Sequence, residues 1–216
     1  MKLTELFQEN KLSLSFEVFP PKTDTAFASV KAAVEEIAEL HPSFMSVTYG
    51  AGGAGAHSRT CEIASKIKNG LGVESMAHLT CVGSDEQTIE SRIAEFRASG
   101  IENVLALRGD LPTDADNRGW KYRHANELAA ELTSRGFCVG GACYPEVHPE
   151  SVNQKEDIAH IKAKVEAGCQ FLTTQMFFDN NLLYNFLYKI REAGIMVPIV
   201  AGIMPITNAN QVERAI

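Results

Sequence analysis

The sequence is short of basic residues and of long apolar runs. Its 20 Lys and Arg face 27 Asp and Glu, which gives a formal net charge of -7 at pH 7, and the basic residues form no cluster. Because binding to nucleic acid needs clustered cations, this composition argues against a nucleic-acid partner. No apolar stretch approaches the roughly 18 residues of a membrane span, and charged residues interrupt the N-terminal stretch 1–14. We therefore expect no membrane association and no signal peptide.

The cysteines lack the pattern of a disulfide framework. They are odd in number, include no C-x-x-C pair, and several stand inside apolar runs; they are Cys61, Cys81, Cys138, Cys143 and Cys169. We expect them to be reduced core residues of a cytoplasmic protein. With 45% hydrophobic residues among 216 and no low-complexity linker, the chain is expected to form a single domain.

What the sequence contains instead is a repeated alternation of apolar runs and amphipathic stretches. The run 12–19 alternates as a strand does, with Leu12 and Leu14 on its apolar face, and it ends at Pro20. A helical stretch, 25–40, follows. Further strands are expected at 44–48, 73–79, 103–107, 137–142, 171–174 and 197–203, and further helices at 58–67, 89–96, 124–135, 156–167, 182–193 and from 208 onward. Glycines that fit a left-handed C-cap close several of the helical stretches: Gly70, Gly100, Gly136, Gly168 and Gly194.

Strands that alternate with helices predict parallel βαβ units, in either an open doubly wound sheet or a (β/α)8 TIM barrel. Polar residues stand near the ends of six strands: Glu17, Thr48, His78, Arg108 with Asp110, Tyr144 with His148, and Gln175. An open sheet concentrates its site at one switch point, whereas a barrel surrounds one mouth with loops, so we favour the barrel. Seven strands are one short of a barrel. We therefore expect either a form truncated after seven strands, its C-terminal βα unit missing, or a chain in which something else covers the gap.

Two motifs have a familiar pattern in an unsuitable context. Residues 50–55 match the G-x-G-x-x-G dinucleotide fingerprint, but the acidic residue that should end the next strand is absent, because Glu74 lies at its start and His78 at its end. We prefer a flexible loop that a ligand or lid can approach. Residues 114–119 are faintly similar to an EF-hand loop, but Arg118 occupies a ligand position. In a different segment, Glu146 and His148 could bind a metal ion, but they supply only two ligands. We expect no metal site.

Three strand ends carry residues with two open interpretations each. Glu17, on an apolar strand, is either a general acid whose pKa burial raises or a carboxylate paired with Arg or Lys inside a barrel. Arg108 to Asp110 is either a solvated turn or a pair of charges delivered to a site. The amide of Gln175 either recognises a carboxamide or pterin edge, or bonds to neighbouring backbone.

Six segments in series resemble the methylenetetrahydrofolate reductase family. They are 16–22 (FEVFPPK), 46–50 (SVTYG), 78–81 (HLTC), 105–112 (LALRGDLP), 144–149 (YPEVHP) and 174–175 (TQ). The resemblance runs in order from about Leu14 to Asn208, which is nearly the whole chain. It implies a (β/α)8 barrel that carries FAD at the carboxyl ends of its strands. It also implies reduction of 5,10-methylenetetrahydrofolate to 5-methyltetrahydrofolate with electrons from NAD(P)H.

The resemblance also implies roles for particular residues. Glu17 corresponds to the general acid that protonates N10 of the folate, Asp110 to the acid beside flavin and pterin, and Gln175 to an amide that contacts folate and nicotinamide. Residues assigned to FAD binding are Thr48, His78, Leu107, Arg108, Gly109, Asp110, His124, Ala125, Tyr144, His148, Asp157, His160, Lys164 and Thr173. His124 and His160 depart from the residues of a well-known bacterial member, which bears on the adenosine half of the FAD site.

The resemblance implies 5,10-methylenetetrahydrofolate and NAD(P)H as small-molecule substrates, and we expect a cytoplasmic homo-oligomer. It implies that residues 1–216 are one flavin-binding barrel domain. The alternative is an inactive folate- or flavin-binding fragment of such a barrel. A metal-dependent barrel aldolase or hydrolase lacks its ligands in this sequence.

Overall fold

The computed structural model describes residues 1–7, 12–21, 26–49, 53–111 and 119–215. Its centre is a sheet of seven parallel strands that follow one another in the order of the sequence. The strands are β1 (Ser15–Val18), β2 (Phe44–Val47), β3 (Glu74–Thr80), β4 (Asn103–Leu107), β5 (Cys138–Cys143), β6 (Phe171–Thr174) and β7 (Ile199–Val200). An open doubly wound sheet reverses its strand order at a switch point, and no reversal occurs among these strands. The barrel prediction is therefore confirmed: the sheet curls into seven of the strands of a (β/α)8 barrel.

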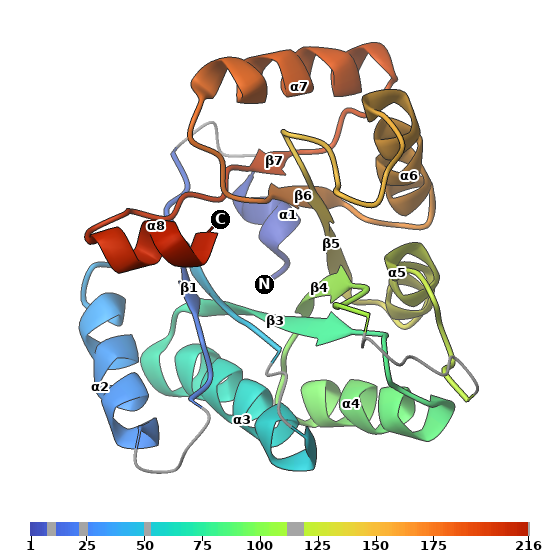
Figure 1. Ribbon diagram of the computed structural model, residues 1–216. Helices are drawn as coiled ribbons and strands as arrows, with labels where there is room; N and C mark the ends of the chain where they lie inside the picture. The colour runs from blue at the N-terminus through green and yellow to red at the C-terminus, as the bar shows by residue number, and fades with distance from the viewer. Residues whose placement is uncertain (8–11, 22–25, 50–52, 112–118, 216) are drawn as a thin grey trace.

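Helices surround the strands as an outer ring (Figure 1). They are α2 (Phe27–Ala38), α3 (Gly53–Ser65), α4 (Glu86–Ala98), α5 (Ala125–Ser134), α6 (Gln154–Glu166), α7 (Asn180–Glu192) and α8 (Ala209–Ala215); α3 continues as a π-helical turn, η1 (Lys66–Gly70). The ring and the outer face of the strands enclose an aliphatic core that includes Val47, Leu79, Val104 and Val139. Burying this face on the helices is what holds each βα unit in place.

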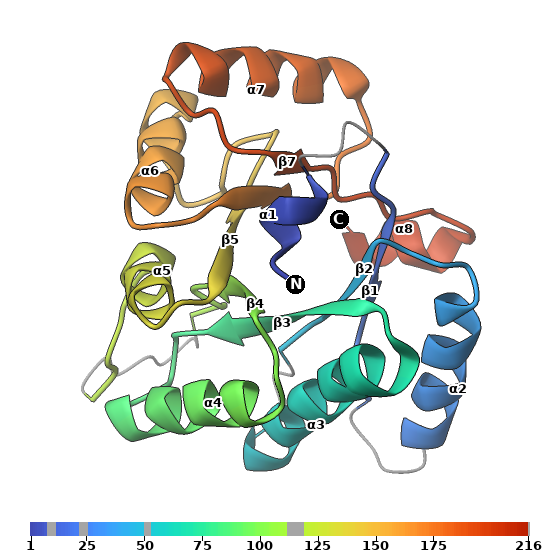
Figure 2. The same ribbon diagram turned by 180° about the vertical axis from the view of Figure 1, so that it is seen from behind.

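The inner face of the strands forms a second, smaller core that closes one end of the barrel. Its buried residues are Leu3, Phe44, Met76, Leu105, Cys138 and Phe171. Leu3 comes from the short helix α1 (Leu3–Leu6), which lies across the amino ends of the strands (Figure 2). Gly140 makes room for Phe171, because a Cβ at Gly140 would stand 2.4 Å from Cε2 of that ring. The barrel floor is thus filled, and an approach from this end is blocked.

Polar contacts hold α1 on the floor. The buried side chain of Asn103 accepts a hydrogen bond from the Leu3 amide at 2.9 Å and donates to the carbonyls of Met1 and Ser75 at 3.1 and 3.2 Å. The ammonium of Met1 lies 3.0 Å from a Glu74 oxygen. The bond from the Leu3 amide pairs a backbone donor that α1 would otherwise bury without a partner.

Most expected elements agree with the structure, and the exceptions are informative. The strand expected at 12–19 was too long: β1 begins at Ser15, and Leu12 is 95% exposed. The strand expected at 197–203 has only two residues in the sheet, since β6 is its one paired neighbour among the described strands. The C-cap expected at Gly70 was wrong, because Gly70 ends the π-helical turn and Gly72 has the positive φ of +70°. Helix α1 was not expected at all.

The expected cysteine environment is also found. The five cysteines are buried and form no disulfide. Within the described residues, no helix is long and apolar enough to cross a membrane.

Candidate functional site

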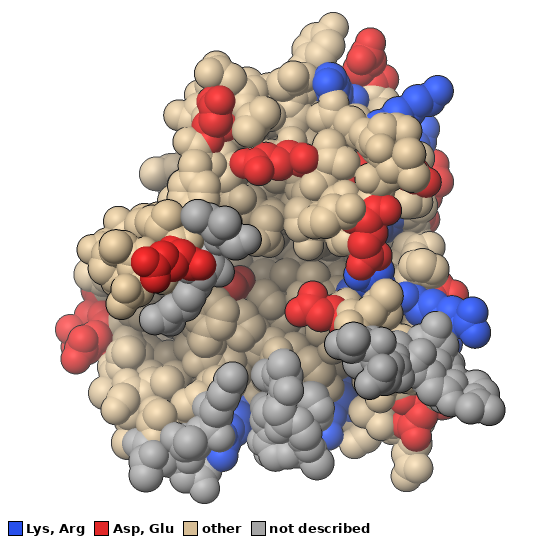
Figure 3. Space-filling view, in the orientation of Figure 1, with Lys and Arg blue, Asp and Glu red and all other residues tan. Residues whose placement is uncertain are grey.

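The residues singled out from the sequence gather at the carboxyl ends of the strands. Glu17, His78 and Thr173 lie within strands, and Leu107 ends β4. Residues that directly follow strands are Thr48, Arg108, Gly109, Asp110, Tyr144 and Gln175. Figure 1 looks onto this end of the barrel, and Figure 3 shows that the same face is hollowed at its centre. The geometry of parallel strands has therefore brought together groups that are far apart in the sequence.

Glu17 projects toward two polar neighbours from the next strands. Glu17 in β1 is paired in register with Ser46 in β2, and its Oε2 lies 3.5 Å from the Ser46 hydroxyl. The same oxygen lies 3.5 Å from Nε2 of His78 in β3. Partial burial raises the pKa of the Glu17 carboxyl, whose side chain is still 44% exposed, and the hydrogen bond from Ser46 opposes the rise. Among the described residues no Arg or Lys pairs with Glu17, so the ion-paired interpretation finds no partner there.

His78 is the most deeply enclosed group of this cluster. Its side chain is 6% exposed, and burial lowers the pKa of the imidazole to about 4. Nε2 is buried and has no hydrogen-bond partner among the described residues. His78 is therefore neutral at pH 7 and offers an unused polar atom beside Glu17.

Arg108 is held by a partner that the sequence did not reveal. Its Nη1 and Nη2 donate to the two carboxylate oxygens of Glu150 at 2.5 and 2.6 Å. This pairing raises the pKa of Arg108 and lowers that of Glu150. Glu150 stands one residue beyond the YPEVHP segment, so its place next to that segment was the signal available; the ion pair spans 42 positions, and nothing local predicts it.

Gly109 occupies a conformation that a side chain would disturb. Its φ is +87°, and a Cβ there would lie 3.2 Å from Cβ of Thr80. Because glycine has no side chain, the backbone can adopt this conformation and pass close to β3. Asp110 follows on the exposed rim, where its charge contributes to raising the pKa of Tyr144, after the larger effect of burial.

The segment after β5 forms a second side of the mouth. The rings of Tyr144 and His148 meet edge to face with centroids 4.7 Å apart. Nδ1 of His148 accepts a hydrogen bond from the Glu150 amide at 3.1 Å, and Val147 between them has a φ of +78°. The aromatic pair and the Arg108 ion pair are thereby fixed by one short loop.

Helix α6 places two buried charged groups behind that loop. Asp157 is 5% exposed, and its Oδ1 accepts from the Ser151 hydroxyl at 3.3 Å. Lys164 donates from Nζ to the Ala142 carbonyl at 2.8 Å, and burial lowers the pKa of its ammonium. A cation is thus kept at the end of β5 under partial desolvation.

Strand β6 ends with two threonines and an amide. The Thr173 hydroxyl is buried without a hydrogen-bond partner among the described residues. The Thr174 hydroxyl accepts from the Gly202 amide at 2.9 Å. Gln175 donates its backbone amide to the Cys143 carbonyl at 2.7 Å while its side chain is exposed. Its backbone is therefore anchored, and its side chain faces solvent near the mouth.

The residues expected to bind the adenosine half of FAD are gathered less closely than the other candidate residues. His124 precedes α5, where its backbone amide donates to Glu127 at 2.8 Å, and Ala125 begins the helix. His160 is exposed on α6. In the described part of the chain, no hydrogen bond or ion pair joins His160 to the other candidate residues.

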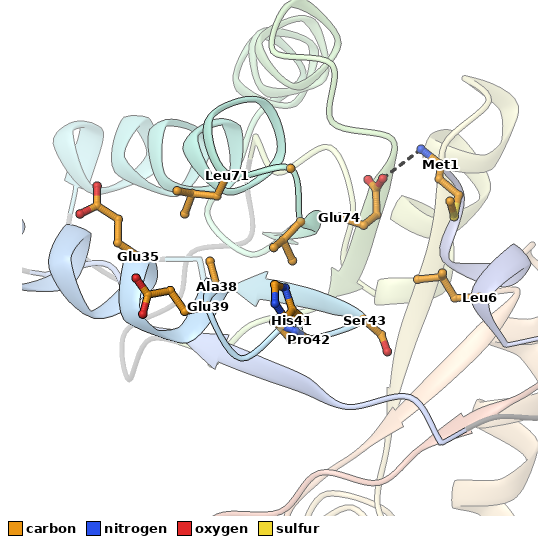
Figure 4. Close-up of a pocket in the computed structure, with 12 residues that line it drawn as sticks. Met1, Leu6, Glu35, Ala38, Glu39, His41, Pro42, Ser43, Leu71 and Glu74 are labelled. Carbon is orange, nitrogen blue, oxygen red and sulfur yellow. Dashed lines mark hydrogen bonds and ion pairs between the residues drawn. The ribbon is translucent and has the colours of Figure 1, made fainter.

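Other features do not compete with this site. The first half of the glycine-rich segment and Asp114 to Arg118 lie outside the described residues; Gly53 onward belongs to α3 rather than to a loop. The described residues contain no group of three or more His, Cys, Asp and Glu suited to a metal ion. A cavity of about 630 Å³ lies at the opposite end of the barrel, between the end of α2 and the start of β3, with His41 and Glu74 in its lining (Figure 4). It contains none of the candidate residues, so it is not the candidate site.

Comparison with known proteins gives consistent matches. A family model described as methylenetetrahydrofolate reductase matches residues 2–216. Methylenetetrahydrofolate reductase (NADH) 1 of Arabidopsis thaliana is 36% identical over 225 residues, which cover 96% of this chain and 37% of that protein. The 5,10-methylenetetrahydrofolate reductase of Escherichia coli K12 is 35% identical over 207 residues, which cover 95% of this chain and 69% of that protein. The chain thus spans about a third of the plant relative and about two thirds of the bacterial one.

A solved structure with the same fold is that of an uncharacterised protein from Clostridium thermocellum that binds two copies of 5-methyl-5,6,7,8-tetrahydrofolic acid. The TM-score is 0.71 at 14% identity, with 99% of this chain and 73% of that chain covered. At this identity the likeness supports the barrel fold alone.

Proposed function

The chain belongs to the methylenetetrahydrofolate reductase family, and from that premise we propose that it reduces 5,10-methylenetetrahydrofolate to 5-methyltetrahydrofolate with NAD(P)H and FAD. The observation that carries the proposal is the position of Glu17, an acid with a raised pKa at the mouth of the barrel. A carboxyl with a raised pKa holds its proton to a higher pH, which suits a general acid.

The residues of the mouth fit a flavin cofactor. The buried Thr173 hydroxyl and the cation of Lys164 at the end of β5 are polar groups that a ligand can satisfy, and Gly109 lets the backbone approach a flat ring. Arg108, kept in one orientation by Glu150, suits an anionic diphosphate. FAD, when bound, would supply the hydride-transfer chemistry.

The remaining FAD-binding assignments stay part of this proposal. They are Thr48, His78, Leu107, Asp110, His124, Ala125, Tyr144, His148, Asp157 and His160.

We assign proton delivery to Glu17. Its carboxyl would donate the proton to N10 of the folate, because partial desolvation raises its pKa although the side chain remains 44% exposed. Asp110 on the rim would favour a positively charged form of the substrate through its own negative charge. The exposed amide of Gln175 would both donate to and accept from a pterin or carboxamide edge.

The state of the cysteines bears on the cellular compartment of the protein. Five buried cysteines without a disulfide fit a reducing environment, and we propose the cytoplasm.

The test is the absorbance spectrum of the purified 216-residue chain before and after FAD is added. The proposal expects a flavin spectrum that NADH or NADPH bleaches and that 5,10-methylenetetrahydrofolate restores under anaerobic conditions. A protein that takes up no FAD defeats the proposal.

One observation favours a second candidate, a barrel that binds folate or flavin without turnover. Strands β1 and β7 are the two edges of the described sheet and do not pair with each other. An open edge lets water reach the mouth, and reductive chemistry benefits from excluding water. Flavin that binds but is neither bleached nor restored would favour this candidate.

A further inference from the structure

We propose that His78 is a positioning residue for the Glu17 acid: its unprotonated Nε2 accepts a hydrogen bond from the protonated carboxyl and holds that carboxyl at the mouth. The inference rests on the proposed function for the role of Glu17 as an acid, but the hydrogen bond itself is a property of the chain alone.

The geometry supports this pairing. Nε2 of His78 is buried and without a hydrogen-bond partner among the described residues, and Oε2 of Glu17 lies 3.5 Å from it. Buried polar atoms in folded proteins are nearly always paired, so an orphaned nitrogen next to a carboxyl calls for a proton between them. One proton serves both atoms when the carboxyl carries it and the imidazole accepts.

The charges around the pair favour that arrangement. From β2 the neighbour of Glu17 is the uncharged hydroxyl of Ser46, from β3 it is His78, and the residues of β7 are aliphatic. No described cation faces the carboxyl to hold it ionised. Burial raises the pKa of Glu17 above its usual 4.5 and lowers that of His78 to about 4, so of the two groups the carboxyl is the better holder of the proton.

Ser46 and His78 act on Glu17 in opposite directions from equal distances of 3.5 Å. The hydroxyl donates to the carboxylate and favours ionisation, whereas an accepting nitrogen favours the protonated acid. The two neighbours therefore set the pKa of the acid between them.

The test is an infrared titration of Glu17 in the full chain, which needs neither flavin nor folate. The carboxyl band is assigned as the one lost in Glu17→Gln. In His78→Leu, which removes the acceptor, we expect the midpoint to fall by about one pH unit, a tenfold weaker hold on the proton. In His78→Gln, whose amide oxygen can accept, it should return toward the wild-type value. In the matched control Ser46→Ala the midpoint should rise.

The sign of the shift decides the matter. A midpoint that rises in His78→Leu means that His78 donates to an ionised Glu17, and an unmoved midpoint means no coupling; either result overturns the inference. If His78→Leu does not fold, the ¹⁵N spectrum of the wild-type chain decides instead: an unprotonated Nε2 supports the inference, and a protonated Nε2 overturns it. Since turnover is not measured, an inactive chain with the expected shifts would sink the proposed function and leave this hydrogen bond standing.

Discussion

Replacing Gly140 with alanine should damage the barrel floor, and the structure gives the size of the effect. A Cβ at Gly140 would lie 2.4 and 2.5 Å from two ring atoms of Phe171 and 3.1 Å from Cδ1 of Leu105. Ordinary contacts between carbon atoms are about 3.5–4.0 Å, so the ring must move by about 1 Å. Phe171 has no exposed surface, and the ring of Phe7 is packed against it with centroids 5.4 Å apart. The packing around Phe171 therefore leaves no space for the displaced ring.

Overpacking of this kind costs about 1–3 kcal/mol. For a chain of this size each kcal/mol lowers the melting temperature by about 2–4 °C, so Gly140→Ala should melt roughly 2–12 °C below the wild type. Urea unfolding gives the free energy directly. A second substitution, Phe171→Leu, removes the ring, and the pair should be less destabilising than the sum of the single changes.

The matched control is Gly70→Ala. A Cβ at Gly70 would meet only Cγ of Lys66 at 3.6 Å, an ordinary contact, and neither glycine has a positive φ. The control should stay within about 0.5 kcal/mol of the wild type or gain slightly. If Gly140→Ala is as harmless as the control, the floor is not packed as described.

Three further results are expected. Asn103→Ala should cost about 1–3 kcal/mol in urea unfolding, because the Leu3 amide loses its buried acceptor; an unchanged midpoint contradicts this. Burial lowers the pKa of His78 from 6.5 to about 4, so the neutral imidazole contributes fully to stability above pH 6.5. As the pH drops to 4, this contribution falls by up to about 3 kcal/mol, because the unfolded chain binds a proton that the folded chain does not. His78→Leu should lose this component of the pH dependence, and parallel curves for variant and wild type would refute it. Glu150→Gln should change stability by less than about 1 kcal/mol, because Glu150 is 54% exposed, yet weaken FAD binding several-fold by releasing Arg108; unchanged or tighter binding speaks against the positioning role.

The sequence predicted best where apolar pattern and burial coincide. Strands 103–107 and 171–174 were expected with the bounds that the structure has, because each is buried and bounded by clear breaks. The pattern failed at the edges of the sheet: Leu12 and Leu14 alternate as strand residues do, yet both are exposed, because β2 is the one neighbour of β1 among the described strands. Hydrophobic alternation shows that a strand would have an apolar face, whereas burial of that face requires a neighbouring element to cover it.

The sequence predicted where the candidate residues lie, at the ends of the strands, but not which of them contact one another. The order of the strands brought the strand-end residues to one mouth, as the βα pattern implied. Which groups pair there depends on distances across the barrel, such as that between Arg108 and Glu150, and no periodicity encodes them. Helix α1 could not be predicted either, because four residues are too few to show a helical hydrophobic period. Leu3 is buried by its packing on the barrel floor, which the local sequence does not encode.

Glu17 is proposed to supply the proton for folate reduction. The most direct test of this role is to follow the two half-reactions of the FAD-loaded Glu17→Gln variant separately by anaerobic stopped-flow absorbance. We predict that flavin reduction by NADH or NADPH stays near the wild-type rate, while reoxidation by 5,10-methylenetetrahydrofolate slows by about 100-fold or more. Reoxidation at the wild-type rate, or the loss of both half-reactions together, would contradict it.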